Sequence, residues 1–486
     1  MASTSVSGVD FADIQGIVRF GYKHMTEACF LLLEIKDAAA ARVWLGSAPV
    51  SSARDQKPPP PTALQIAFTA PGLRAMGAPE PVLAGFSSEF LSGMTGEESR
   101  SRRLGDVGAN APAAWRWGGN PQQVPHLAAM FYAEPGRLRG WMATLQNGIW
   151  ESAFRVIETL ETSDLHGREP FGFADGISEP ELDWGLRRPF VADQLTYTNQ
   201  LALGECLLGF QNEYGKYTDR PLVDRADLPP AEDDSSKYDV GRNGTYLVFR
   251  HLQQDVRGFW QFVNRATGGS ASERDKLAES MIGRTLDGDP LVAATGKNGF
   301  TYEADGNGLR CPFGAHLRRA NPRTADFSIA VHGTLDKLIH QLALKPRKFR
   351  DDLIASTRFH RIVRRGREYG PALGREEALL PAPPEDPERG LHFICLNGNI
   401  SRQFEFVQNA WLMNSKFNGM TGESDPLLGN REPLPDGTGT DAFCLPQAAG
   451  LSSRISGLPQ FITVRGGAYF FLPGLRALRY FVRAGA

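Results

Sequence analysis

The chain has 486 residues, 41% of them hydrophobic and 22% charged, with a formal net charge of -2 at pH 7. This balance gives no electrostatic basis for binding nucleic acid or an anionic membrane, and no apolar run reaches the roughly 18 residues of a membrane span. Five widely spaced cysteines without a CxxC pair argue against a disulfide framework or a structural zinc site. The first residues, MASTSVSGVDFADIQG, lack a basic and apolar signal pattern, so we expect a cytoplasmic protein.

The first half alternates between strand and helix patterns. Short apolar runs predict strands, and segments of helix-forming composition predict helices between them. The predicted strands are 28–35, 64–69, 126–133 and 151–161, and the predicted helices are 37–45, a short one near 71, and 134–148. This order, strand-helix-strand repeated twice, is typical of a ferredoxin-like α+β unit.

The second half repeats this plan around a long insertion. It predicts strands at 244–252, 392–398 and 461–471, and helices at 253–266, at 401–413 and from 473 onward. The pentapeptide GMTGE occurs at 93–97 and again at 419–423, which favours an internal duplication. We therefore predict two antiparallel α+β domains, 1–225 and 226–486, with the boundary in the polar stretch 212–243.

The segment CPFGAHLRRANPR, at 311–323, places His316 among Arg318, Arg319 and Arg323. A neutral imidazole can ligate haem iron, and arginines can bind haem propionates. The small residues Gly314 and Ala315 would let a flat ligand approach the backbone. The alternative is a surface histidine in a basic loop.

Two further segments carry polar residues suited to a reaction site. In REPFGFADGISEP, at 168–180, Asp175 could protrude from a tight turn into a cavity, although an ordinary Asp-Gly turn is the alternative. In HRIVRRGREYG, at 360–370, Arg364 and Arg365 predict one inward and one solvent-facing arginine; alone, they would be a solvated charge run. An inward arginine could stabilise negative charge on a departing peroxide oxygen.

Together these segments resemble the dye-decolourising peroxidase family. GFADG matches its GxxDG motif, CPFGAHLRRANPR resembles its proximal-histidine segment, and IVRRGREYG resembles its distal-arginine segment. The likeness extends from DIQG near the N-terminus to FITVRGGAYFFLP near the C-terminus. It implies two ferredoxin-like domains, with one haem b held in the C-terminal one. The segment 324–359 is an insertion between the histidine and the arginine.

The resemblance also implies roles for individual residues. His316 would be the proximal iron ligand, Asp175 the distal acid and base, and Arg364 the distal arginine. Arg323 would contact a propionate, and Glu405 is our candidate to accept a hydrogen bond from His316.

The implied activity is a haem peroxidase that reduces hydrogen peroxide and oxidises dyes, phenols or other organic donors by one-electron steps through a ferryl intermediate. Leu391 and Phe393, two apart on one strand, would line the distal pocket. Tyr369 is a candidate electron relay for bulky donors, with packing as its alternative role. A non-catalytic haem carrier would need only His316 and Arg323.

Two points stay open at this stage. A chlorite-dismutase-like or iron-releasing activity on a related fold is a further alternative, although the GxxDG motif favours a peroxidase. The chain could be a monomer or a homodimer.

Overall fold

The computed structural model describes residues 8–146, 148–187, 199–294, 296–323 and 357–483, so most of the predicted insertion 324–359 lies outside the described residues. The centre of the molecule is one mixed-length antiparallel sheet with strand order β10-β12-β9-β15-β2-β3-β1-β4, and β11 also pairs with β12. These strands are β1 (Glu27–Ile35), β2 (Thr62–Phe68), β3 (Leu127–Ala133), β4 (Phe154–Glu161), β9 (Thr245–Gln254), β10 (Val363–Arg364), β11 (Arg367–Tyr369), β12 (Gly390–Asn397) and β15 (Ile462–Leu472).

The sheet consists of two similar halves joined edge to edge. The N-terminal half has the order β2-β3-β1-β4, and the C-terminal half has the equivalent order β10-β12-β9-β15. They meet through β15 and β2, where Phe471 pairs with Phe68. In both halves the first and third strands are central, as in a ferredoxin-like unit. The predicted α+β fold with two ferredoxin-like antiparallel sheets is therefore confirmed.

The central strands form because their residues are apolar on both faces. Every residue of β3 is buried, and β9 is buried at all but one position. The longer helices are α1 (Ala38–Ser47), α6 (Leu138–Leu145), α8 (Val256–Ala266), α9 (Ala271–Ile282) and α14 (Leu475–Arg483). Asp255 begins α8 by accepting a hydrogen bond from the Gly258 N–H at 2.8 Å. Two π-helical segments, η7 (Ser401–Glu405) and η8 (Val407–Met413), fill the connection between β12 and β15.

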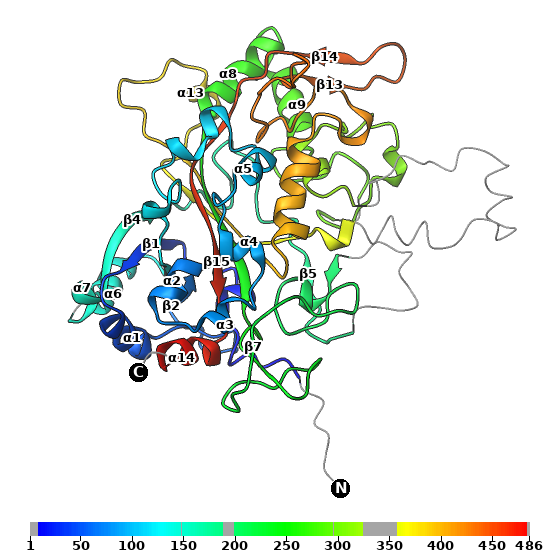
Figure 1. The fold of residues 1–486 in the computed structure, drawn as a ribbon. Helices are drawn as coiled ribbons and strands as arrows, with labels where there is room; N and C mark the ends of the chain where they lie inside the picture. Colours follow the sequence, from blue (N-terminus) through cyan, green and yellow to red (C-terminus); the bar gives the residue numbers. More distant parts are fainter. Residues whose placement is uncertain (1–7, 147, 188–198, 295, 324–356, 484–486) are drawn as a thin grey trace, which may run out of the picture.

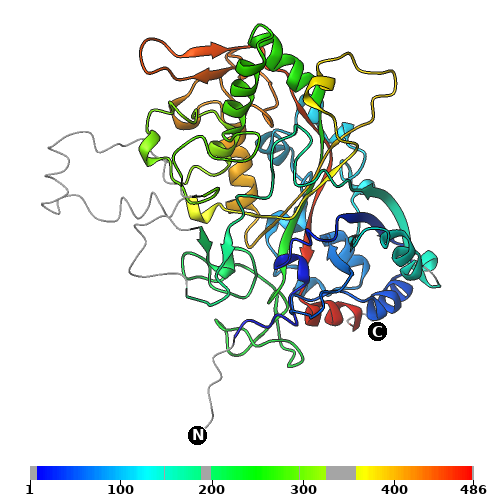
Figure 2. The ribbon, with the colours of Figure 1, turned by 180° about the vertical axis from the view of Figure 1, so that it is seen from behind.

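The last helix, α14, returns to the N-terminal half. The N–H of Leu475 donates to the Asp13 carbonyl at 2.7 Å, and the N–H of Arg476 donates to the Asp13 carboxylate at 2.6 Å. Figures 1 and 2 show α14 beside α1 at one end of β15, with α8 and α9 at the other end. The domain boundary at residue 225 stays a prediction.

The two GMTGE segments do not occupy equivalent positions. The first lies between β2 and β3, after α4 (Ser88–Ser92) and before α5 (Glu98–Leu104). The second lies between η8 and β15, which is the final connection of the C-terminal half. The duplication argument drawn from this repeat is therefore wrong, whereas the shared strand order of the halves does not depend on it.

Shorter elements complete the described chain. They are α2 (Ala70–Ala75), α3 (Glu80–Leu83), α7 (Trp150–Ala153), α10 (His316–Ala320), α13 (Arg375–Ala378), and the paired short strands β5 (Glu181–Leu182) with β6 (Gln200–Leu201), β7 (Leu222–Val223) with β8 (Tyr238–Asp239), and β13 (Phe443–Leu445) with β14 (Ser453–Ile455). Within the described ranges, no helix has the length and apolar character needed to cross a membrane.

Candidate active site

A cavity lies on one face of the C-terminal sheet. Residues of β9, β12 and β15 form one wall, residues of α9, α10 and η8 form the other, and the loop 169–180 from the first half closes one side. Six residues singled out from the sequence line it: His316, Asp175, Arg364, Arg323, Leu391 and Phe393. Glu405 and Tyr369 are not among the lining residues.

His316 begins the short helix α10 and is held by a buried carboxylate. Its Nδ1 lies 3.0 and 3.1 Å from the two carboxylate oxygens of Asp425. One of these oxygens also accepts hydrogen bonds from the N–H groups of Leu427 and Leu428, at 3.0 and 2.9 Å. We assign the ring proton to Nδ1, which leaves the Nε2 lone pair for a ligand in the cavity. Burial alone would raise the pKa of Asp425, but its contacts with His316 and Arg319 lower it.

Glu405 is not the partner of His316, so this prediction is wrong. Its carboxylate forms a buried ion pair with Arg100 at 2.8 Å and accepts a hydrogen bond from the Tyr469 hydroxyl at 2.9 Å. These contacts direct Glu405 toward α5 and β15, while Asp425 takes the place beside the histidine.

This correction can be tested on the holoprotein. A carboxylate that accepts a hydrogen bond from the Nδ1–H group makes the imidazole a stronger electron donor, and losing such a partner typically costs about 10- to 100-fold in metal affinity or activity. If the cavity holds haem, as the resemblance implies, Asp425→Asn should reduce activity by that factor and raise the reduction potential of the bound iron. Glu405→Gln is the matched control and should leave the potential unchanged in a redox titration. An unchanged potential in Asp425→Asn, with a shift in Glu405→Gln, would restore the original assignment.

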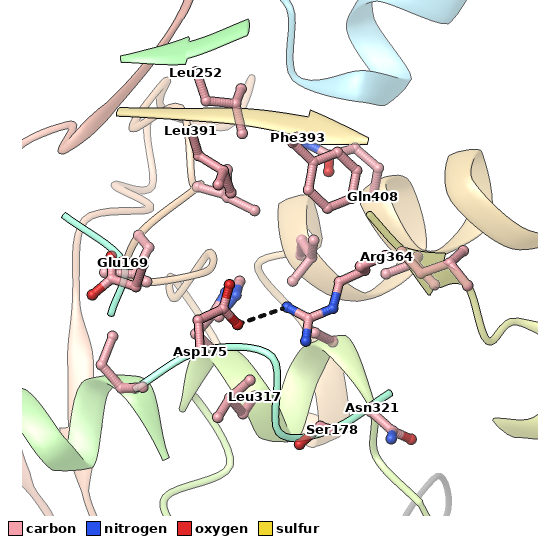
Figure 3. A pocket seen from close by; sticks show the side chains of 18 of the residues that line it. Glu169, Asp175, Ser178, Leu252, Leu317, Asn321, Arg364, Leu391, Phe393 and Gln408 are labelled. Carbon is pink, nitrogen blue, oxygen red and sulfur yellow. Dashed lines mark hydrogen bonds and ion pairs between the residues drawn. The ribbon is translucent and has the colours of Figure 1, made fainter. Parts of the chain in front are cut away.

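The loop that carries Asp175 is fixed by backbone contacts. The N–H of Asp175 donates to the Gly167 carbonyl at 2.9 Å, and the N–H of Ala174 donates to the Leu286 carbonyl at 3.0 Å. Gly172 and Gly176 have φ of 99° and 71°, a region that favours glycine. The tight turn presents the carboxylate to the cavity, as predicted, and Figure 3 shows it directed toward Arg364.

Arg364 lies on β10 and faces two carboxylates. Its guanidinium is 3.4 Å from Asp175 and 2.9 Å from Glu179, and its backbone N–H donates to Glu179 at 2.8 Å. Burial alone would lower the pKa of Arg364, but Glu179 and Asp175 more than offset this effect and raise it. Its neighbour Arg365 does not face solvent as expected, because its guanidinium donates to the carbonyls of Ile17 and Val18.

Leu391 and Phe393 on β12 both point into the cavity, beside Leu252 of β9 (Figure 3). Tyr369 on β11 pairs with Gly390 and so lies on the opposite face of the sheet from Leu391. Its ring stacks on His392 with centroids 4.6 Å apart, and its hydroxyl donates to Glu388 at 2.9 Å. An electron-relay role for Tyr369 stays a prediction.

Comparisons with known proteins agree with this geometry. The chain is 30% identical to dye-decolorizing peroxidase msp1 of Mycetinis scorodonius, over 98% of this chain and 88% of the relative. The chain belongs to the dye-decolourising peroxidase family.

Other members of the family are also similar to this chain, in sequence or in fold. The chain is 27% identical to the multifunctional dye peroxidase DyP2 of an Amycolatopsis species, over 86% of this chain and 81% of the relative. A solved decolorizing peroxidase from Auricularia auricula-judae has the same fold, with a TM-score of 0.70 and 24% identity over 99% of this chain and 100% of its own. No family model matches the chain. As a family member, the chain is a haem peroxidase.

The cavity has the donor set that haem requires. It offers an imidazole for iron, apolar walls from β12 and β15, and a cluster of arginines that includes Arg284 and Arg323. Burial, and next the neighbouring cation of Arg323, lower the pKa of Arg284. Guanidinium groups in this cavity can form charge-assisted hydrogen bonds to the propionates of a haem.

Arg323 itself is anchored in the cavity wall. It donates to the carbonyls of Asn298 and Phe300 at 3.2 and 3.1 Å, and it lies 3.9 Å from the centre of the Phe300 ring. Its contact with a propionate stays a prediction. Gly314 is expected from the sequence to leave room for a flat ligand. A side chain at this position would instead meet Phe443 and Glu423 at 3.2 Å, so the glycine leaves room for these two residues.

Three residues of the site escaped the sequence reasoning. The Asp425 carboxylate faces His316, and the Glu179 carboxylate faces Arg364. The Glu169 carboxylate faces the GxxDG turn. Only Glu169 and Glu179 stand in a segment that had already drawn attention, REPFGFADGISEP.

Proposed function

We propose that the chain binds one haem b in this cavity, with His316 as the proximal ligand. It then reduces hydrogen peroxide and oxidises dyes, phenols or other organic donors by one-electron steps. The observation that carries the proposal is the pairing of His316 with Asp425 and of Asp175 with Arg364 around one cavity. A haem carrier would need only His316 and Arg323, and no pairing of Asp175 with Arg364.

The protein residues divide the work of the peroxide step. Haem, when bound, supplies the iron at which peroxide is cleaved and holds the oxidising equivalents. Asp175 takes a proton from the peroxide and returns it to the departing oxygen, so that water leaves. The cation of Arg364 offsets the negative charge that develops on that oxygen. Glu179 fixes the orientation of Arg364 through its contacts with both side chain and backbone.

The donors are proposed from the relatives and from chemistry. One solved relative is a dye-decolorizing peroxidase in complex with 2,6-dimethoxyphenol, 21% identical to this chain with a TM-score of 0.69. Small phenols are therefore the first donors to consider. Bulky dyes would need electron transfer through the protein, for which Tyr369, 9% exposed, is our candidate. Cytoplasmic location and a monomeric or dimeric state stay predictions.

The test is a direct assay of the purified protein loaded with haem. We expect one haem per chain, and peroxide-dependent oxidation of 2,6-dimethoxyphenol and of a dye. The control is the same protein without peroxide. A stoichiometric haem complex that oxidises neither donor would favour the haem-carrier alternative.

A further inference from the structure

The strands that form one wall of the cavity carry a second cluster on their opposite face. Leu391 and Phe393 of β12 point into the cavity (Figure 3), so His392, which lies between them, points away from it. Its partner on β9 is His251, which also points away because its neighbour Leu252 lines the cavity. The two imidazole centroids are 4.9 Å apart. The thickness of the sheet separates this histidine pair from the cavity.

Tyr369 of β11 packs on both histidines. Its ring is stacked on His392 with an interplanar angle of 17°, and it meets the His251 ring edge-on with centroids 5.0 Å apart. Within the described residues, His392 Nδ1 and both ring nitrogens of His251 are buried without a hydrogen-bond partner. Burial lowers the pKa of both histidines, that of His392 to about 4, so both rings are neutral. A chain of packed rings therefore leads from the phenol to the strand that forms the cavity wall.

The phenol of Tyr369 ends on a carboxylate. Its hydroxyl donates to Oε1 of Glu388 at 2.9 Å, a distance at which a proton can pass directly. Oε2 of Glu388 faces Arg116 at 2.7 Å and Arg465 at 3.5 Å. Nε2 of His251 lies 3.9 Å from Oε1. The arginines thus hold one oxygen of Glu388 in place, and the other oxygen meets the phenolic proton.

The hydroxyl end of Tyr369 lies close to solvent. Tyr369 is 9% exposed, but the Glu388 side chain is 21% exposed and that of Arg116 is 47% exposed. A donor too large for the cavity can therefore approach the phenol from outside. Tyr469 also donates to a carboxylate, that of Glu405, at 2.9 Å, but it is 2% exposed and out of reach of such a donor.

Oxidation of a phenol changes its acidity. Burial, and then the Glu388 carboxylate, raise the pKa of Tyr369, so the resting phenol keeps its proton. A phenol that has lost an electron is a strong acid, and it passes its proton to a base in contact with it. Without that base a charged radical would stay buried against neutral rings, which costs free energy.

We propose that Glu388 accepts the phenolic proton when Tyr369 is oxidised and so makes Tyr369 an electron relay for bulky donors, a role that rests on the proposed function. Tyr369 gives one electron to the cofactor that peroxide has oxidised, and its O–H proton goes to Glu388. A neutral tyrosyl radical and a carboxylic acid remain. A donor outside then supplies one electron, and Glu388 returns the proton to the phenol oxygen. Glu388 is a positioning residue because it acts through Tyr369.

The primary experiment is electron paramagnetic resonance of the haem protein frozen soon after mixing with peroxide. The wild type should show a neutral tyrosyl radical that is absent in Tyr369→Phe. Glu388→Gln keeps the size of the side chain and an oxygen that accepts the phenol hydrogen bond, but its amide cannot take the proton. The Tyr369 signal should therefore be lost in Glu388→Gln, together with oxidation of a bulky dye.

Glu232→Gln is the matched control. Tyr217 donates to Glu232 at 2.8 Å, which is the same kind of pair, but it lies in the stretch 212–243 and neither residue lines the cavity. This variant should keep the Tyr369 signal. A signal that persists at full yield in Glu388→Gln, or is lost in Glu232→Gln as well, overturns the proposal.

A light-driven measurement separates this proposal from the peroxidase function and from the folding of Glu388→Gln. A ruthenium(III) complex generated by light can withdraw the electron without peroxide, and the same Tyr369 radical should form. Infrared difference spectra of the wild type should then gain a carboxylic-acid band that Tyr369→Phe lacks. If the haem protein does not react with peroxide but gains this band, the proposed function fails and the proton transfer stands. Oxidation of Tyr369 without the band, or no Tyr369 radical at all, overturns the proposal.

Discussion

Asp175→Asn should slow the reaction with hydrogen peroxide by about 10²- to 10⁴-fold while haem still binds. The amide preserves the size of the side chain and can keep its place in the turn, because the turn is held by backbone contacts at Asp175 and Ala174. It cannot take up and return a proton. Stopped-flow spectroscopy of the haem band after mixing with peroxide measures this rate directly.

Arg364→Leu is the companion variant because it removes charge stabilisation and leaves the proton path. Loss of a comparable preorganised donor costs about 2.7 to 4 kcal/mol. It also leaves Glu179 without its closest cation, so haem content should be measured alongside the rate. Wild-type rates in both variants at every pH would mean that neither residue takes part, and the haem-carrier alternative would gain.

The residues that the sequence predicted correctly for the cavity stand in segments too patterned for ordinary turns. Each of these segments combines glycines and arginines around one candidate residue: His316, Asp175 or Arg364. A simple turn or surface loop would not require so long a pattern. The structure places all three on one cavity. The Asp175→Asn and Arg364→Leu variants test the catalytic roles of two of them.

The partner of His316 was missed for a physical reason. Asp425 is 109 residues away along the chain, and in ESDPLLG it resembles an ordinary turn residue that binds the following N–H groups. It does bind those of Leu427 and Leu428, and it serves the histidine as well. The family resemblance points instead to Glu405, in the predicted helix 401–413. That helix is π-helical, so its side chains follow a different angular spacing from an α-helix, and Glu405 contacts Arg100.

The sequence predicts the long strands of the fold but not its short ones. The long strands β1, β3 and β9 carry apolar runs that predict burial on both faces. By contrast, β10 and β11 span two and three residues, and their pairing with β12 defines them. No periodicity can be read from so few residues, although this edge positions Arg364.

His316→Ala is expected to remove the axial imidazole and to change the spectrum of the ferric haem protein. His316 lines the cavity, and the contact between its Nδ1 and Asp425 leaves its Nε2 for a ligand. Added imidazole should restore the histidine-ligated spectrum, because a free ligand can occupy the vacated space. Haem affinity should fall in the variant and recover in part with imidazole.

His360→Ala provides the control. Its ring stacks on Phe406 with centroids 3.6 Å apart, and its Nδ1 contacts the Arg402 carbonyl at 2.5 Å. Burial lowers the pKa of His360 to about 4, and His360 is not among the residues that line the cavity. We expect His360→Ala to keep the axial-ligand spectrum, although it loses ring packing. If His360→Ala lost that spectrum and His316→Ala retained it together with full haem affinity, the ligand assignment would be reversed.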